Sequence, residues 1–166
     1  MKSVKWTLPL LLVAAMAAGQ QPVPAQQATL VVKTIGGQTL TLAAQDLAKL
    51  PQVKLDAKDH DGNNREYDGV KLRDVLTQAG VATGNDLRSK EMTDCVVVEA
   101  SDGYRVVFSL AELDPDFGNV QAMLAKSVAG QPLGAKEGPL RLIVPGDKRQ
   151  ARWVRMVTTV SVTREQ

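Results

Sequence analysis

The residues best suited to chemistry are cationic and lie near the C-terminus. Between residues 136 and 155, six basic side chains outnumber two acidic ones, which gives this stretch a net charge of +4 (Lys136, Arg141, Lys148, Arg149, Arg152 and Arg155 against Glu137 and Asp147). Gly146-Asp147-Lys148-Arg149 follows a predicted strand. Such a loop can bind an anion, because arginine offers forked donors, lysine a point charge and the backbone further N–H groups. The same charges would equally suit a solvated sheet edge.

A second candidate is the acidic turn at residues 58–63. Asp59, Asp61 and Gly62 match positions of a calcium-binding loop, but Ala57 stands at the first ligand position and Asp68 replaces the final glutamate. The flanking segments are predicted strands rather than helices, so we predict a solvent-exposed hairpin turn. His60, the single histidine, lies in this turn and is predicted to be a surface residue.

Cys95 is the single cysteine and cannot form an internal disulfide. It begins an apolar segment, and the adjacent Asp94 disfavours a reactive thiolate. We therefore predict a structural cysteine. The sequence assigns no catalytic residue and no metal ligand.

The surrounding pattern predicts many short strands and few helices. Strands are expected at 28–34, 39–42, 53–58, 95–100, 104–108, 123–128, 140–144 and 154–162, the last with Val154, Met156, Val160 and Val162 facing inward. Short helices are expected at 43–50 and 71–79, and a helical turn capped by Ser109 at 109–113. No βαβ rhythm appears, so we predict an α+β fold with mixed, mostly antiparallel sheets.

The N-terminal segment resembles a secretory signal. Lys2 and Lys5 precede an apolar run of about a dozen residues, which is short of the ~20 needed to span a bilayer. Small residues at Ala17 and Ala25 offer two cleavage positions. We expect a signal peptide at residues 1–25, one domain at 26–166, and a periplasmic or secreted protein with no membrane attachment after cleavage. Residues 26–166 carry 18 basic and 18 acidic side chains, a balance that argues against nucleic-acid binding.

Six motifs in order resemble the molybdopterin-binding oxidoreductase domain of the sulfite oxidase family. They are Tyr67-Asp68-Gly69-Val70-Lys71-Leu72-Arg73-Asp74-Val75-Leu76, Ala79-Gly80-Val81, Ser101-Asp102-Gly103-Tyr104, Leu124-Ala125 with Gly130-Gln131-Pro132-Leu133, Gly138-Pro139-Leu140-Arg141-Leu142-Ile143-Val144-Pro145-Gly146 and Arg152-Trp153-Val154. The resemblance implies an α+β fold that holds molybdopterin, with the metal bound by the dithiolene and a protein cysteine. It places the pterin-contacting lysine of the family at Arg152, and Arg149 matches a family arginine.

One departure from the family concerns the metal. The strand that carries the metal-binding cysteine in the family corresponds here to residues 53–58, which contain no cysteine. The resemblance therefore implies molybdopterin as a candidate cofactor without the usual thiolate for molybdenum.

Three functions remain open from the sequence. The first is a module that uses Gly146, Lys148, Arg149, Arg152, Asp102 and Tyr104 to hold an anionic small ligand, a pterin or a partner protein. The second is a molybdenum oxidoreductase, or a subunit of one with a redox partner protein, that has an atypical metal site. The third is an interaction domain with no small ligand.

Overall fold

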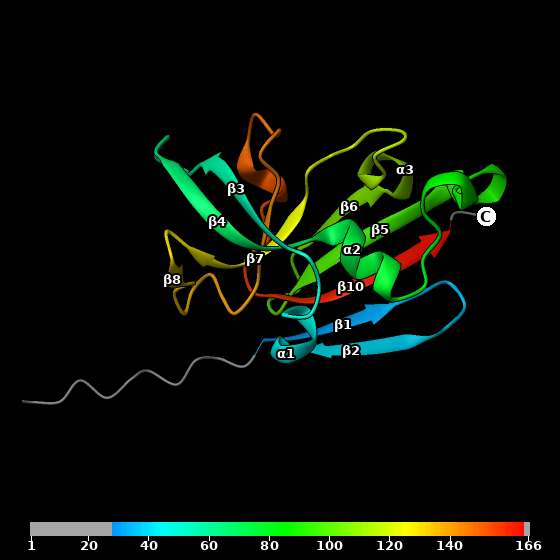
Figure 1. Cartoon of the computed structure of the whole chain (residues 1–166), viewed down its shortest axis with the longest axis horizontal. Coiled ribbons are helices and arrows are strands. Elements are labelled where there is room, and N and C mark those ends of the chain that lie inside the picture. Colours follow the sequence, from blue (N-terminus) through cyan, green and yellow to red (C-terminus); the bar gives the residue numbers. More distant parts are fainter. Residues whose placement is uncertain (1–27, 165–166) are drawn as a thin grey trace, which may run out of the picture.

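The computed structural model describes residues 28–164, which form two sheets and several short helices (Figure 1). The elements in chain order are β1 (Thr29–Lys33), β2 (Thr39–Ala43), α1 (Ala44–Leu47), β3 (Gln52–Lys58), β4 (Asn64–Lys71), α2 (Leu72–Gln78), η1 (Gly84–Asp86), η2 (Ser89–Thr93), β5 (Asp94–Ala100), β6 (Arg105–Ser109), α3 (Leu110–Leu113), β7 (Met123–Val128), β8 (Gln131–Pro132), β9 (Arg141–Ile143), η3 (Gln150–Arg152) and β10 (Val157–Arg164). The predicted signal segment, residues 1–25, lies outside the described residues.

Both sheets are mostly antiparallel, as the α+β prediction requires. The first has the strand order β2-β1-β10-β5-β6, and its one parallel pair joins β1 to β10. The second has the order β3-β4-β7-β8, and β9 also pairs with β7. Because the C-terminal β10 lies between β1 and β5, the first sheet depends on contacts between distant parts of the chain.

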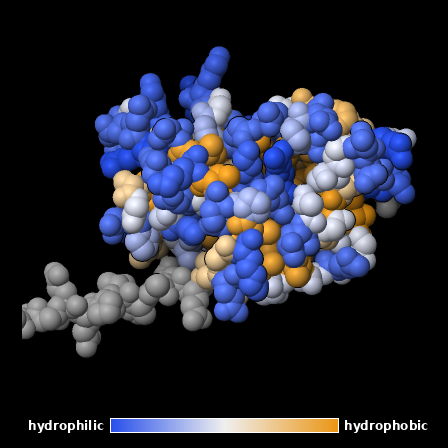
Figure 2. Space-filling model, in the orientation of Figure 1, coloured by the Kyte–Doolittle hydropathy of each residue, from blue (hydrophilic) through white to orange (hydrophobic). Residues whose placement is uncertain are grey.

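The core is mostly aliphatic, as expected for a composition with 4% aromatic residues, and Tyr67, Phe108 and Trp153 are the aromatic side chains in it. Leucine and valine side chains from both sheets and from α2 form one buried cluster. Figure 2 shows hydrophilic side chains over most of one face of the molecule, with hydrophobic ones visible in the gaps between them. Among residues 28–164, no helix is long and apolar enough to cross a membrane.

Local sequence signals account for α2 and α3. Leu72, Val75 and Leu76 form the buried face of α2, and Gly80 adopts φ +76° just after its end, where an L-residue would be strained. Ser109 caps α3 by accepting a hydrogen bond from the backbone N–H of Glu112 at 3.0 Å. These predictions are confirmed.

A bulge brings two strands of the second sheet unusually close. The register between β4 and β7 shifts between Asp68 and Gly69. A Cβ atom on Gly69 would clash with the carbonyl oxygen of Leu124 and would lie 2.7 Å from the Cα of Ala125. Only glycine permits this approach, which sets the position of β3 and β4 against the rest of the molecule.

Two predicted elements differ in extent. The helix expected at 43–50 is the single turn Ala44–Leu47, because Lys49 and Leu50 bond to carbonyl oxygens three residues back and Pro51 has no N–H to continue the helix. The Gln52 side chain then binds the Leu47 and Leu50 carbonyl oxygens. The closing strand begins at Val157 rather than at Val154. Met156 has φ +50°, and a bulge follows between Val157 and Thr159, so Val157 is buried and Met156 is only partly so.

Candidate functional site

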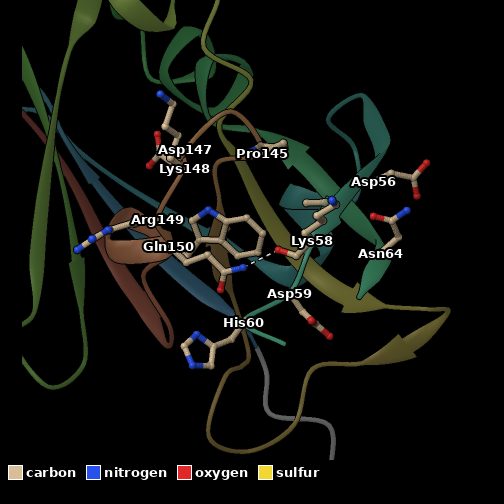
Figure 3. Close-up of a pocket in the computed structure, with 12 residues that line it drawn as sticks. Asp56, Lys58, Asp59, His60, Asn64, Pro145, Asp147, Lys148, Arg149 and Gln150 are labelled. Atoms are coloured by element: carbon tan, nitrogen blue, oxygen red, sulfur yellow. Dashed lines mark hydrogen bonds between the residues drawn. The ribbon is translucent and has the colours of Figure 1, made fainter. Parts of the chain in front are cut away.

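A cleft of about 900 Å³ opens between the β3–β4 hairpin and the loop that leads from β9 to η3 (Figure 3). Its lining comes from these two segments and Trp153 (Asp56, Ala57, Lys58, Asp59, His60 and Asn64 on the hairpin; Pro145, Asp147, Lys148, Arg149 and Gln150 on the loop). The two walls are about ninety residues apart in the sequence. The cleft therefore exists only in the folded chain.

The tip of the hairpin is fixed by one carboxylate. Asp59 accepts hydrogen bonds from the backbone N–H groups of Asp61 at 3.0 Å and Asn63 at 2.9 Å, and from Nε of Arg65 at 3.0 Å. The Arg65 hydrogen bond is the main reason that the pKa of Asp59 lies below its ordinary value. The carboxylate is thus occupied by its own turn, which accounts for the hairpin turn predicted from the calcium-like pattern.

The opposite wall is held by three hydrogen bonds, two of which join it to distant segments. The Gln150 amide donates to the carbonyl oxygen of Lys58 across the cleft. The Tyr104 hydroxyl donates to the carbonyl oxygen of Ala151 at 2.7 Å, and Nε1 of Trp153 donates to that of Val144 at 2.9 Å. Figure 3 shows the Gln150 bridge directly. These bonds hold the loop between two hairpins, so its side chains are presented from a fixed backbone.

Arg152 is engaged within the protein. Its guanidinium makes two hydrogen bonds to the Asp147 carboxylate, at 2.7 and 3.0 Å, and one to Glu112 at 3.2 Å. It also stacks 4.4 Å from the ring centroid of the buried Phe108. The bond to Asp147 raises the pKa of Arg152. Arg152 lines neither this cleft nor the second hollow described below.

The remaining cations of the cleft have no such partners. Lys58, Lys148 and Arg149 are exposed and form no ion pair among the described residues. Of the three carboxylates in the lining, Asp59 is paired with Arg65 and Asp147 with Arg152. Arg152 is shared between Asp147 and Glu112, so one of these two carboxylate charges is not compensated. Together with Asp56 it opposes the three free cations, which leaves the cleft with a small positive excess.

A second hollow of about 670 Å³ adjoins the cleft and shares three lining residues, His60, Gln150 and Trp153, with it. Polar groups from three further segments complete it (Asp102, Tyr104, Glu137, Arg141 and Arg155). Arg141 forms an ion pair with Glu137, lies 5.5 Å from the Trp153 ring centroid, and has a buried Nε with no hydrogen-bond partner among residues 28–164. The two hollows meet at His60, which is exposed as expected.

The residues predicted from the sequence are divided between the cleft and the second hollow. Lys148 and Arg149 line the cleft, Asp102 and Tyr104 line the second hollow, and Gly146 lies in the loop between two cleft-lining residues. The sequence interpretation missed Lys58 and Gln150. No local pattern marks them, because their positions depend on the pairing of β3 with β4 and on the course of the distant loop.

Cys95 lies away from both hollows. It is the second residue of β5 in the first sheet and has a partly exposed side chain, and its Sγ is 3.9 Å from the carbonyl oxygen of Thr93. The adjacent Asp94 is buried and paired with Arg164. Within residues 28–164, no group of three or more histidine, cysteine, aspartate or glutamate side chains could hold a metal ion.

The sequence model of the oxidoreductase molybdopterin binding domain matches residues 18–166. The chain belongs to this family. This molybdopterin-binding domain is 30% identical over 162 aligned positions to mitochondrial sulfite oxidase from Rattus norvegicus. The alignment covers 79% of this chain and 28% of that protein.

A solved structure shows the same fold. The sulfane dehydrogenase SoxCD from Paracoccus pantotrophus superposes with a TM-score of 0.63 at 21% identity, covering 82% of this chain and 38% of that one. The sulfite-oxidase-type α+β fold predicted for this molybdopterin-binding domain is thereby confirmed. The chain spans well under half the length of either protein.

The side chains of the cleft suit one part of the family's cofactor and not another. The free cations of the cleft suit an anionic group such as the phosphate of molybdopterin. The donor set does not suit a thiolate-ligated molybdenum, because Ala57 and its neighbours on β3 supply no sulfur and Cys95 lines neither hollow. The molybdopterin-binding domain thus fits the anionic part of the cofactor and not the usual protein ligation of its metal.

Proposed function

We propose that this domain is a binding module whose cleft holds the anionic group of a small ligand, with molybdopterin as the candidate cofactor. The observation that carries the proposal is the set of three unpaired cations, Lys58, Lys148 and Arg149, around one cleft. They come from both walls of the cleft, and Figure 3 shows Lys148 and Arg149 extending outward from the loop, so these exposed side chains would turn inward to contact an anion. Family membership supports the same class of ligand.

The hydrogen bonds that hold the loop favour ligand binding, because they order its backbone in advance. Ordering a flexible loop around a ligand costs free energy at each immobilised side chain. Here the Gln150, Tyr104 and Trp153 hydrogen bonds hold the backbone before any ligand arrives. Binding then costs the conformational entropy of the Lys148 and Arg149 side chains, and not that of the loop backbone.

The second hollow would hold the uncharged part of such a ligand. It offers the half-exposed ring of Tyr104 and polar groups at Asp102 and Glu137, whereas Trp153 is buried and contacted by Arg141. A heterocycle could stack against an aromatic ring while its N–H and carbonyl groups bind these side chains. Because the two hollows share His60 and Gln150, one elongated anion can occupy both.

Calorimetric titration with inorganic pyrophosphate tests the anion site. Arg149→Ala should weaken binding about tenfold to a hundredfold, since a hydrogen bond to a charged group contributes about 1.5–3 kcal/mol. Arg88→Ala is the matched control, because Arg88 is also exposed and lines neither hollow. An equal loss in both variants, or no binding by the unaltered protein, would refute the proposal.

A second function is favoured by the position of Asp56. This exposed carboxylate lies on β3, the strand that lines the cleft, and forms no ion pair among the described residues. A carboxylate can act as a metal ligand, so an oxidoreductase, or a subunit of one, with an atypical molybdenum site is the alternative. We also propose export to the periplasm or medium, on the basis of the N-terminal pattern.

Metal and pterin analysis separates these two functions. The protein would be purified from a molybdenum-replete host and assayed for both components. Pterin without metal supports the binding module. Stoichiometric molybdenum that disappears in Asp56→Ala but persists in Cys95→Ser supports the oxidoreductase with Asp56 as ligand.

A further inference from the structure

The first sheet ends in a strand that exposes an apolar side chain. β6 is the last strand in the order β2-β1-β10-β5-β6. Its residues alternate between the core and the surface, and the central one, Val107, is 55% exposed. Arg105 and Ser109 lie beside it on the same exposed face. A strand in this position presents backbone groups that a further strand can use.

The hairpin geometry shows which backbone groups those are. The β5–β6 turn is closed by hydrogen bonds from Ala100 N to the Tyr104 oxygen at 2.9 Å and from Gly103 N to the Ala100 oxygen at 3.1 Å. Hydrogen-bonded pairs then recur at every second position, at Val98↔Val106 and at Val96↔Phe108. The N–H and C=O groups of Arg105, Val107 and Ser109 therefore point away from β5.

The other long edge strands in the described part of the chain, β3 and β2, expose charged or polar side chains. β3 carries charges at alternate exposed positions, Lys54, Asp56 and Lys58, which discourage strand addition. β2 exposes Thr39 and Thr41. β6 alone among these three combines an open edge with an exposed aliphatic side chain at its centre.

We propose that β6 pairs antiparallel with β6 of a second copy of this chain, with the two-fold axis at Val107. In this register Val107 faces Val107 of the second copy, and Arg105 faces Ser109. The outward N–H and C=O groups of all three residues then meet complementary groups, because the set is symmetric about its centre. The two five-stranded sheets become one continuous sheet.

Alternative registers are less favourable. An axis at Arg105 would place two guanidinium groups opposite each other, and like charges in this position are destabilising. An axis at Ser109 would run the pairing into α3, which begins at Leu110. A shift by one residue would place Val106 or Phe108 opposite the second copy, and their N–H and C=O groups already point to β5, so the hydrogen bonds between the two copies could not form.

The side chains on the exposed face support the chosen register. Val97 and Val107 are direct cross-strand neighbours in the hairpin. Pairing about Val107 extends them into a row of four valines across four strands, a contact that β-branched residues favour. Arg105 keeps its own cross-strand neighbour, Glu99, and gains an uncharged one. The interface is small, so we expect a dimer that dissociates on dilution.

A proline substitution tests the backbone pairing. Val107→Pro removes an N–H that points away from β5, so the hairpin keeps its own hydrogen bonds. Thr41→Pro is the matched control on the opposite edge, because the β1–β2 hairpin closes in the same way, with Thr34 N bonded to the Gln38 oxygen and Gly37 N to the Thr34 oxygen. Sedimentation velocity over a hundredfold range of concentration should show dimers for the unaltered protein and Thr41→Pro, and monomers for Val107→Pro.

A charge-swap experiment tests the axis itself and does not depend on proline being tolerated. Val107→Lys and Val107→Glu should each be monomeric, because the axis places like charges in contact. Their equimolar mixture should recover dimers as mixed pairs. An unaltered protein that stays monomeric at the highest concentration, or a mixture that fails to associate, would overturn the proposal.

Discussion

Removing the Arg152 side chain should cost stability rather than ligand affinity. Arg152→Ala deletes the paired hydrogen bonds to Asp147, the bond to Glu112 and the stacking on Phe108. Hydrogen bonds to charged groups contribute about 1.5–3 kcal/mol and a cation–π contact about 0.5–1 kcal/mol at exposed sites. The side chain is 31% exposed, so solvent screens part of this sum.

We therefore expect the free energy of unfolding to fall by about 2–3 kcal/mol, which corresponds to a Tm lower by about 6–9 °C for a domain of this size. Urea denaturation followed by the fluorescence of Trp153, which adjoins Arg152, measures the change. Arg152→Lys keeps the charge but loses the planar fork, and should retain about half of the stability. Arg149→Ala is the matched control and should change the free energy of unfolding by less than ~0.5 kcal/mol.

The opposite pattern would refute this reasoning. If Arg152→Ala unfolds at the same urea concentration as the unaltered protein and loses pyrophosphate affinity as Arg149→Ala does, then Arg152 binds the ligand. That outcome would match the family position of the pterin-contacting cation. The two variants separate the roles that the sequence interpretation gave to both arginines together.

Two further predictions concern the tyrosines. Tyr104→Phe keeps the ring and removes only the hydroxyl that donates to the Ala151 carbonyl oxygen. Because one hydrogen bond is lost, the backbone amides of η3 should exchange with solvent about two- to tenfold faster, as measured by mass spectrometry. Unchanged exchange would show that the loop does not depend on this hydrogen bond. Burial raises the pKa of Tyr67, so the folded state binds its proton more tightly than the unfolded state does, and stability that is fully present below pH ~10 should be lost as pH rises through the folded value. Tyr67→Phe should remove part of that alkaline loss in urea titrations at pH 9 and above, and an identical alkaline loss in the variant would contradict the assignment.

Local elements could be predicted from the sequence where the signal was also local. The spacing of Leu72, Val75 and Leu76 and the glycine at 80 specify α2 without help from the rest of the chain. Ser109 with Glu112 three residues on specifies α3 in the same way. The closing strand was placed too early, because alternation alone gives no sign of the positive φ at Met156 or the bulge that follows.

The site was predictable only in part, because its two walls are far apart in the sequence. The cationic loop was recognised from composition, but its opposite wall, including Lys58, comes from a strand about ninety residues earlier. Gln150 shows no pattern of its own and gains its role by reaching the Lys58 carbonyl oxygen. Contacts of this kind depend on sheet register, which hydrophobic alternation constrains only weakly at a charged edge.

The sequence by itself determined the family, the fold class and the presence of an excess of positive charge near the C-terminus. These follow from the order of motifs, from residue periodicity and from simple counting. Tertiary structure decided which of those charges are available to a ligand. Arg152 pairs with Asp147, five residues away in the sequence, and with Glu112, forty residues away, whereas Arg149 forms no ion pair among the described residues. An ion pair requires two side chains to come within about 4 Å, and only the folded chain fixes which ones do.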